Sequence, residues 1–266
     1  AMSHRADEGL PILEWSPSGV RAWVPGKKDL LSFDSVEAAA RSGILPNGRV
    51  GAAVSRRHIF IKQVRLPNTA KAEAAMVLSR KLDSLLPVAG TELASDFQFM
   101  DDVTSEGRLA VLAAMKVTDL QQMKADFKAA GLKITWICPA GLGAAQAAKT
   151  SGLEDAIVAE ATDDGLAFDV IQKGQLTASR LVGTRTGAID MSAELSRTMA
   201  AYGLSGAPIL AAGGLNLPAA SHSAKESTLA FLHGVVTHFE LETPEDQRRK
   251  EEKKVNARRS MAALFA

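Results

Sequence analysis

Few side chains in this 266-residue chain are placed to do covalent or metal chemistry. The single cysteine, Cys138, lies in an apolar run without a neighbouring base, which predicts a packed thiol rather than a nucleophile. One cysteine also excludes a disulfide framework and favours a reducing compartment. The five histidines are scattered without metal-ligand spacing, so the sequence predicts no metal site.

The remaining candidates are acidic residues and glycines that stand at turns. Glu14 precedes the turn 16–19, Glu160 precedes Asp163-Asp164-Gly165, and the pair Gly213-Gly214 follows an apolar strand. A carboxylate can hold a divalent cation with its waters, and glycine lets backbone N–H groups approach a phosphate closely. The glycine pair equally predicts a tight strand-to-helix turn.

Composition limits the class of protein. A hydrophobic content of 46% and a length of 266 residues predict one or two soluble globular domains. The net charge of +1, with acids and bases interspersed, argues against a nucleic-acid surface. The opening Ala-Met-Ser-His resembles a tag remnant, and the sequence contains neither a secretory signal nor a complete transmembrane run.

The centre of the chain has the element order of a ferredoxin-like βαββαβ unit over residues 56–138. Two helices are expected, one capped by Asn68 or Thr69 and the other by Thr118. The expected strands are 58–67, 97–103, 109–117 and 133–138.

The flanking segments predict two further groups of elements. Before the block, residues 11–24 read as a hairpin and 36–42 as a short helix. After it come an alanine-rich helix, a three-stranded meander, a helix, a short strand and a final helix. In order, these are residues 140–151, 156–161, 166–172, 175–182, 190–202, 208–212 and 228–239.

Several short signatures in this order resemble a known family. The run VRLP, a helix ending LLPV, a hairpin, and the segment AAGLKITWICPAGLGAAQAA resemble the pilus-assembly M protein (PilM). They resemble still more the cytoplasmic part of the type II secretion L protein (GspL), and GQLTASRLV and PILAAGG stand where that family has them. The resemblance spans residues 10–240 and implies an α/β, actin-like (ribonuclease H-like) fold of two lobes with an inserted ferredoxin-like subdomain.

The resemblance also implies domain limits. The first lobe would comprise 10–55 and 139–151, the inserted subdomain 56–138, and the second lobe 152–240. Residues 241–266 would then form a charged juxtamembrane tail. Basic and acidic residues alternate in this tail, which is typical either of a solvated terminal helix or of a segment next to an anionic membrane. The membrane alternative expects a transmembrane helix beyond Ala266.

In this family each half would present an Asp-X-Gly type turn to the phosphates of a nucleotide, and the matching positions here are degraded. Trp15 is bulky, Pro17 lacks an N–H donor, and Thr162 stands where a glycine is wanted. We therefore expect no catalytic residue and no cofactor, with ATP and Mg²⁺ an unfavoured alternative. The residues that would form the degenerate site are Glu14, Glu160, Gly165, Gly213 and Gly214.

Taken together, the sequence predicts a non-catalytic scaffold at the cytoplasmic face of the bacterial inner membrane. It would link a secretion or pilus ATPase to inner-membrane components, with a homodimer and an anionic membrane surface as further partners and no nucleic acid. Lys71, Lys81 and Lys124 are the expected partner-binding residues, on polar helix faces. Two alternatives remain open: an actin-like nucleotide-binding protein or kinase with ATPase activity, and a cell-division protein that polymerises on nucleotide.

Overall fold

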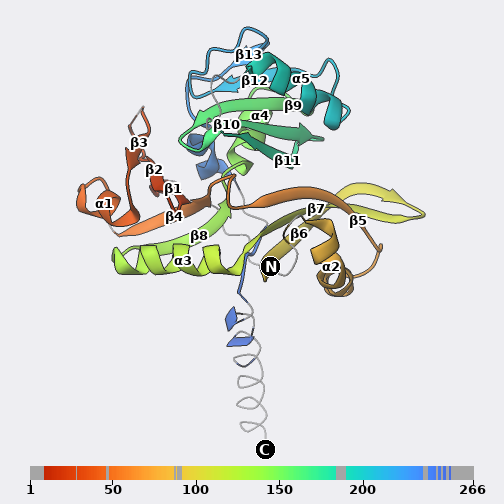
Figure 1. The fold of residues 1–266 in the computed structure, drawn as a ribbon, viewed down its shortest axis with the longest axis horizontal. Helices are drawn as coiled ribbons and strands as arrows, with labels where there is room; N and C mark the ends of the chain where they lie inside the picture. The colour runs from red at the N-terminus through yellow and green to blue at the C-terminus, as the bar shows by residue number, and fades with distance from the viewer. Residues whose placement is uncertain are drawn as a thin grey trace, which may run out of the picture.

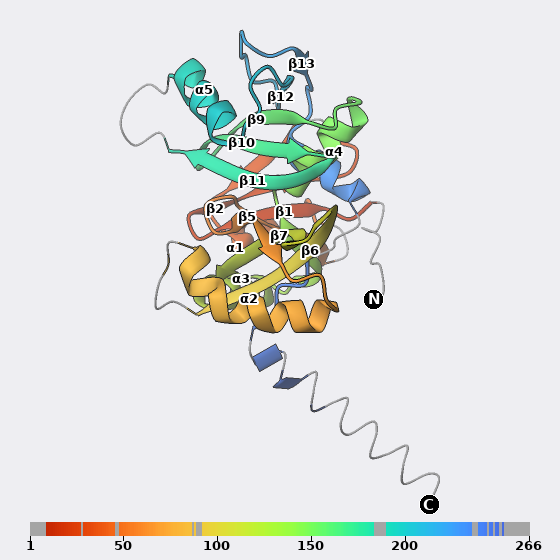
Figure 2. The same ribbon diagram turned by 90° about the vertical axis from the view of Figure 1, so that its right-hand side faces the viewer.

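The computed structural model describes residues 9–252, except 28, 46–47, 87, 89–91, 184–189, 236–238, 244, 247 and 250–251. These residues form two five-stranded sheets and one three-stranded sheet (Figure 1). In Figure 1 one large sheet lies at the top, the other at lower left and the small sheet at lower right; in Figure 2 the small sheet faces the viewer, in front of the lower large sheet. The expected α/β class and its two lobes are confirmed.

The first lobe is built on the sheet β3-β2-β1-β4-β8. The predicted hairpin is β1 (Ile12–Ser16) and β2 (Gly19–Trp23), and it continues antiparallel into β3 (Leu31–Phe33). On the other side of β1, β4 (Arg49–Val54) and β8 (Lys133–Pro139) run parallel to it. Helix α1 (Val36–Arg41) joins β3 to β4, and Ser35 caps it by accepting from Ala38 N.

The second lobe repeats this topology with the order β11-β10-β9-β12-β13. The meander is formed by β9 (Ala156–Thr162), β10 (Gly165–Gln172) and β11 (Gln175–Val182), as the sequence predicted. Beyond β9, β12 (Ile209–Ala212) and β13 (His222–Ser223) are parallel to it. The elements that complete this lobe and join it to the first are α4 (Leu142–Thr150), α5 (Met191–Ala201) and the 3₁₀ helix η1 (Thr228–Gly234).

The central block differs from the prediction at its end. Its sheet contains only β5 (Phe60–Leu66), β7 (Gly107–Lys116) and β6 (Leu93–Thr104), in the order β5-β7-β6, and α2 (Lys71–Leu85) covers one face. The last predicted strand, β8, instead pairs with β4 in the first lobe. Because parallel neighbours need a crossover, α3 (Val117–Ala129) serves as the β4-to-β8 connection, and β5, α2, β6 and β7 are inserted within it.

Two expected helix caps are wrong. Helix α2 begins after Ala70 rather than at a capping Asn68 or Thr69, and α3 begins after Lys116, so Thr118 lies inside its first turn. In both cases tertiary contacts hold the helix without a side-chain cap. Helix α5 does have a side-chain cap, since Asp190 Oδ1 accepts from Ala193 N.

A short extended segment after η1 packs against the first lobe and the insert. The side chains of Phe239 and Leu241 are each 5% exposed and belong to the same apolar core as α3. Glu240 N donates to Asp96 Oδ2 at 2.9 Å. The start of the predicted charged tail is therefore packed against the body, because its apolar side chain Leu241 is buried in the core.

Candidate functional site

The two predicted acidic residues occupy equivalent central strands of the two lobes. Glu14 lies on β1 and Glu160 on β9, and they are 4% and 1% exposed. A carboxylate buried this completely requires charge compensation or hydrogen bonds. The structure supplies both through two arginines that the sequence analysis did not single out, Arg21 and Arg56.

Arg21 is the cross-strand neighbour of Glu14 on the β1–β2 hairpin. Its Nε donates to Glu14 Oε2 at 2.8 Å, and its Nη1 lies 3.6 Å from Glu160 Oε1. Burial alone would lower the pKa of Arg21, but the carboxylates of Glu14 and Glu160 raise this pKa above its ordinary value. The guanidinium thus stays charged and joins the two lobes.

Arg56 follows β4 and is the second cation of the cluster. Its Nε donates to Asp169 Oδ2 at 2.9 Å, and its Nη2 donates to Thr228 Oγ1 at 3.0 Å. The two terminal nitrogens also lie 3.7 Å from carboxylate oxygens of Glu14 and Glu160. Burial would lower the pKa of Arg56, but the carboxylates of Asp169, Glu160 and Glu14 together raise this pKa above its ordinary value.

Glu160 is held by groups from both lobes. Burial would raise the pKa of its carboxyl, but the charges of Arg56 and Arg21 and the hydroxyls of Ser227 and Thr228 lower it. Asp169, fully buried on β10, also accepts from Ser179. We call Glu14, Arg21, Arg56, Glu160 and Asp169 the interlobe ion cluster. It contains three carboxylates against two guanidinium groups.

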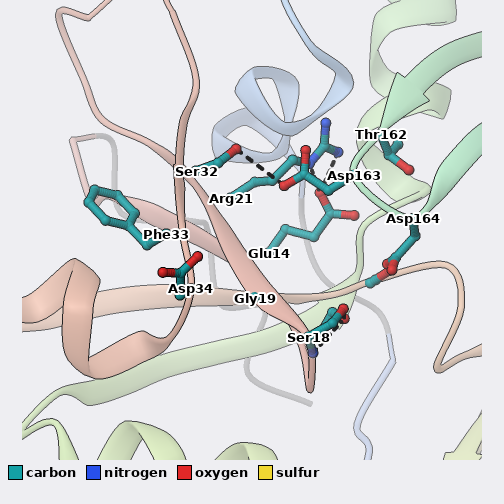
Figure 3. Close-up of a pocket in the computed structure, with 12 residues that line it drawn as sticks. Glu14, Ser18, Gly19, Arg21, Ser32, Phe33, Asp34, Thr162, Asp163 and Asp164 are labelled. Carbon is teal, nitrogen blue, oxygen red and sulfur yellow. Dashed lines mark hydrogen bonds and ion pairs between the residues drawn. The ribbon is translucent and has the colours of Figure 1, made fainter.

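A cleft of about 170 Å³ opens beside this cluster (Figure 3). This volume is below the roughly 300–1,000 Å³ that is usual for small-molecule sites. Charged side chains in its lining are four carboxylates and one guanidinium: Glu14, Asp34, Asp163, Asp164 and Arg21. An excess of negative charge in a partly enclosed cleft opposes entry of a polyphosphate.

Hydrogen bonds from the first lobe also hold the turn between β9 and β10. Ser32 Oγ donates to Asp163 Oδ2 at 3.2 Å, a bond visible in Figure 3, and Ser55 Oγ donates to Asp164. Hydroxyl groups of the first lobe thus donate hydrogen bonds to both adjacent aspartates. These two bonds connect the lobes across the cleft.

The glycines of the expected nucleotide site have backbone conformations and contacts that favour glycine. Gly165 has φ +137°, and a Cβ there would stand 2.3 Å from Val182 O, so the close approach of β11 requires glycine. Gly213 and Gly214 have φ +65° and +71°. Their N–H groups donate to the backbone oxygens of Glu226 and Ala224, at 2.9 and 3.4 Å.

The expectation that the bulk of Trp15 crowds the phosphate site is wrong, because its side chain does not line the cleft. Strand alternation turns this side chain to the face opposite Glu14, where it is fully buried and its Nε1 donates to Asp126 Oδ2 at 2.8 Å. Trp15 therefore anchors α3 to β1 and does not fill the cleft. Pro17 does stand in the two-residue turn between β1 and β2.

The three predicted partner-binding lysines lie in different surroundings. Lys71 Nζ is 3.0 Å from Asp96 Oδ1 and 5.4 Å from the centre of the Phe97 ring. Lys81 is exposed on α2. Lys124 on α3 pairs with Asp246 of the C-terminal segment, so this lysine already has an acidic partner within the chain.

Within the described residues, no group of three or more histidine, cysteine, aspartate or glutamate side chains could hold a metal ion. In the same part of the chain, no helix combines the length and hydropathy of a membrane span.

This geometry is that of the two-lobed, actin-like fold predicted from the sequence, with an ion cluster between its lobes. Neither a family model nor a curated protein matches the sequence. Among solved structures, a chain of the PilM-PilN type IV pilus biogenesis complex is similar, with a TM-score of 0.58 and 15% identity over 77% of this chain and 80% of that one.

A second solved structure is similar over nearly its whole length. It is the cytoplasmic domain of EpsL, an inner-membrane component of the type II secretion system of Vibrio cholerae. The TM-score is 0.57 and the identity 14%, over 89% of this chain and 99% of the EpsL domain. The predicted structural resemblance to this class is therefore confirmed at the level of the fold.

Proposed function

We propose that this protein is a non-catalytic scaffold of a type II secretion or type IV pilus machine. The observation that carries the proposal is the interlobe ion cluster, in which arginines occupy the carboxylates that would otherwise hold a metal ion and its nucleotide. The fold shared with the EpsL cytoplasmic domain and the PilM-PilN complex supports the type of machine.

The chemistry of the cleft supports a binding role over hydrolysis. Glu14 and Glu160 are each within 4 Å of two guanidinium groups, so a Mg²⁺ ion would have to displace protein cations before it could bind them. No hydrolytic water could then be positioned without opening the cluster. The protein would instead act through its surfaces.

As a scaffold, the chain would work at the cytoplasmic face of the inner membrane. It would link a secretion or pilus ATPase to membrane-embedded components, with self-association into a homodimer as a further contact. Lys71 and Lys81 on α2, together with Lys124 on α3, remain the proposed residues for an acidic partner surface. The basic residues beyond Asp246 would meet anionic lipid.

The test is nucleotide binding and hydrolysis by the purified protein. We expect phosphate release at the background rate and almost no change in melting temperature with excess MgATP. If MgATP did bind, a concentration of 100 times its Kd would raise the free energy of unfolding by about 2.7 kcal/mol, and the melting temperature would rise clearly. Gly213→Val serves as the site control. Hydrolysis, or a clear MgATP-dependent thermal shift that Gly213→Val abolishes, would favour the nucleotide-binding alternative.

A further inference from the structure

A cavity on another side of the ion cluster lies where the first lobe, the insert and the second lobe meet. It measures about 600 Å³, within the roughly 300–1,000 Å³ of small-molecule sites, whereas the interlobe cleft of about 170 Å³ is below this range. Its walls come from three places: the segment 56–63 that leads from the first lobe into β5, the end of α2, and β11. Tyr202, 37% exposed, also lines it.

Side chains close one end of this cavity. β11 packs against β5, and the amide oxygen of Gln172 accepts from Gln63 Nε2 and from Thr177 Oγ1, each at 2.9 Å. Gln63 is the last lining residue of β5 and Thr177 the first of β11, so these bonds join the two walls where the cavity ends. The space therefore suits a compact ligand.

The lining of the cavity is positively charged. Its charged residues are Arg56, Arg57 and Lys62, and the described lining includes no carboxylate. Arg56 belongs to the ion cluster, and the side chain of Arg57 is 44% exposed with Asp164 3.6 Å away. Lys62 is exposed, and its one hydrogen bond among the described residues is from Nζ to Leu85 O, at 2.7 Å. Because a carbonyl does not neutralise an ammonium group, Lys62 is the cation most available to an anion.

Apolar side chains form much of the remaining lining. Phe60, Leu85 and Leu181 are partly exposed and face the cavity with Tyr202. Two of these four are aromatic, and aromatic side chains pack well against a flat apolar group. An apolar body would gain free energy from burial here, and a negative group would gain it from Lys62. One free cation and one partly paired cation match a charge of one or two, not a triphosphate.

From this juxtaposition we propose that the cavity binds a small organic anion, in which a carboxylate, sulfonate or phosphate monoester is joined to a compact aromatic body. The anionic group would pair with Lys62 and Arg57, and the aromatic body would lie against Phe60, Leu181 and Tyr202. This inference goes beyond the proposed scaffold role and does not depend on it. Because the walls come from both lobes and the insert, a bound ligand would also stabilise their arrangement.

The test is a fluorescence titration of the intact chain with anilinonaphthalene sulfonate, which joins one sulfonate to aromatic rings. We expect saturable binding to a single class of site. N-phenylnaphthylamine has the same rings without the sulfonate and should bind at least about tenfold more weakly, because it cannot pair with Lys62. Sodium sulfate carries charge without rings, and as a competitor it should also bind at least about tenfold more weakly.

Variants then locate the bound probe. Lys62→Gln removes the charge and should weaken binding by about tenfold, whereas Lys62→Arg keeps the charge and should restore most of the affinity. Tyr202→Ala should weaken binding by about threefold through loss of ring contact. Lys225→Gln, an exposed lysine of the second lobe outside the cavity lining, is the matched control and should leave the affinity unchanged. The melting temperatures of these variants without probe should equal that of the wild type.

Three results would overturn the proposal. The first is an affinity that Lys62→Gln leaves unchanged, which would place the probe elsewhere. The second is equal binding of the charged and uncharged probes, which would mean a purely apolar site. The third is sulfate binding as tightly as the probe, which would mean a general anion site that makes no use of the aromatic lining.

Discussion

Replacing Arg56 by methionine tests whether the interlobe ion cluster holds the fold together. The guanidinium is 2% exposed and donates to Asp169 and Thr228, while Glu14 and Glu160 lie 3.7 Å away. Removing one member of a buried ion pair costs about 3–5 kcal/mol, because the remaining charge stays buried without compensation. For a chain of this size, 1 kcal/mol shifts the melting temperature by about 2–4 °C. We expect Arg56→Met to melt roughly 6–20 °C below the wild type.

The assay is urea unfolding followed by circular dichroism, with thermal melts alongside. Arg57→Met is the matched control, and its half-exposed pair with Asp164 should contribute less than about 1 kcal/mol. The double variant Arg56→Met/Asp169→Leu removes both partners and should recover much of the loss. A cost below about 1 kcal/mol for Arg56→Met, or a double variant no more stable than the single one, would refute the reasoning.

Three further outcomes follow from the same contacts. Because the folded-state pKa of Glu160 is lowered, its stabilising contribution is complete above its ordinary pKa of 4.5 and is lost as the pH falls through the folded-state pKa. Glu160→Gln should therefore flatten the dependence of the melting temperature on pH between pH 7 and pH 3. An unchanged dependence would contradict the role of Glu160 in acid stability. Leu241→Ala should cost about 2–4 kcal/mol in urea unfolding, since the side chain is buried, whereas a freely solvated tail would give almost no change. Charge reversal at Lys71 or Lys81 should weaken pull-down of a secretion ATPase without lowering the melting temperature, and unaltered pull-down by both variants would contradict the proposed surface.

The sequence predicted the lobes well because their signals are local. Alternating residues around Ser16–Gly19 and Asp163–Gly165 predicted the β1–β2 hairpin and the meander of β9, β10 and β11, and the predicted helix over 190–202 matches α5. The partner of β8 could not be predicted in this way. The apolar run 133–138 fits either sheet, and only the parallel crossover from β4, interrupted by the insert, decides its place.

The candidate site was predicted only in part, because its cations lie where charges are not expected. Glu14 and Glu160 were chosen for their position before turns, and the structure brings both into one cluster. Arg21 and Asp169 stand inside apolar strands, between valine, alanine and phenylalanine neighbours. A charged residue at an inward position of such a strand was the available signal, but which carboxylate it pairs with depends on how the lobes meet.

The ion cluster has a consequence for how the two lobes move. A ligand can shift two lobes between arrangements only by its difference in affinity for them. Here Arg21 reaches from β2 to Glu160, and Arg56 reaches from the end of β4 to Asp169, so the protein's own cations already stabilise one arrangement. Opening it would expose two guanidinium groups and three carboxylates at once, a change that nucleotide cannot drive if it does not bind the cluster. We therefore expect the cluster to hold the two lobes in the arrangement seen here, which agrees with the proposed scaffold role.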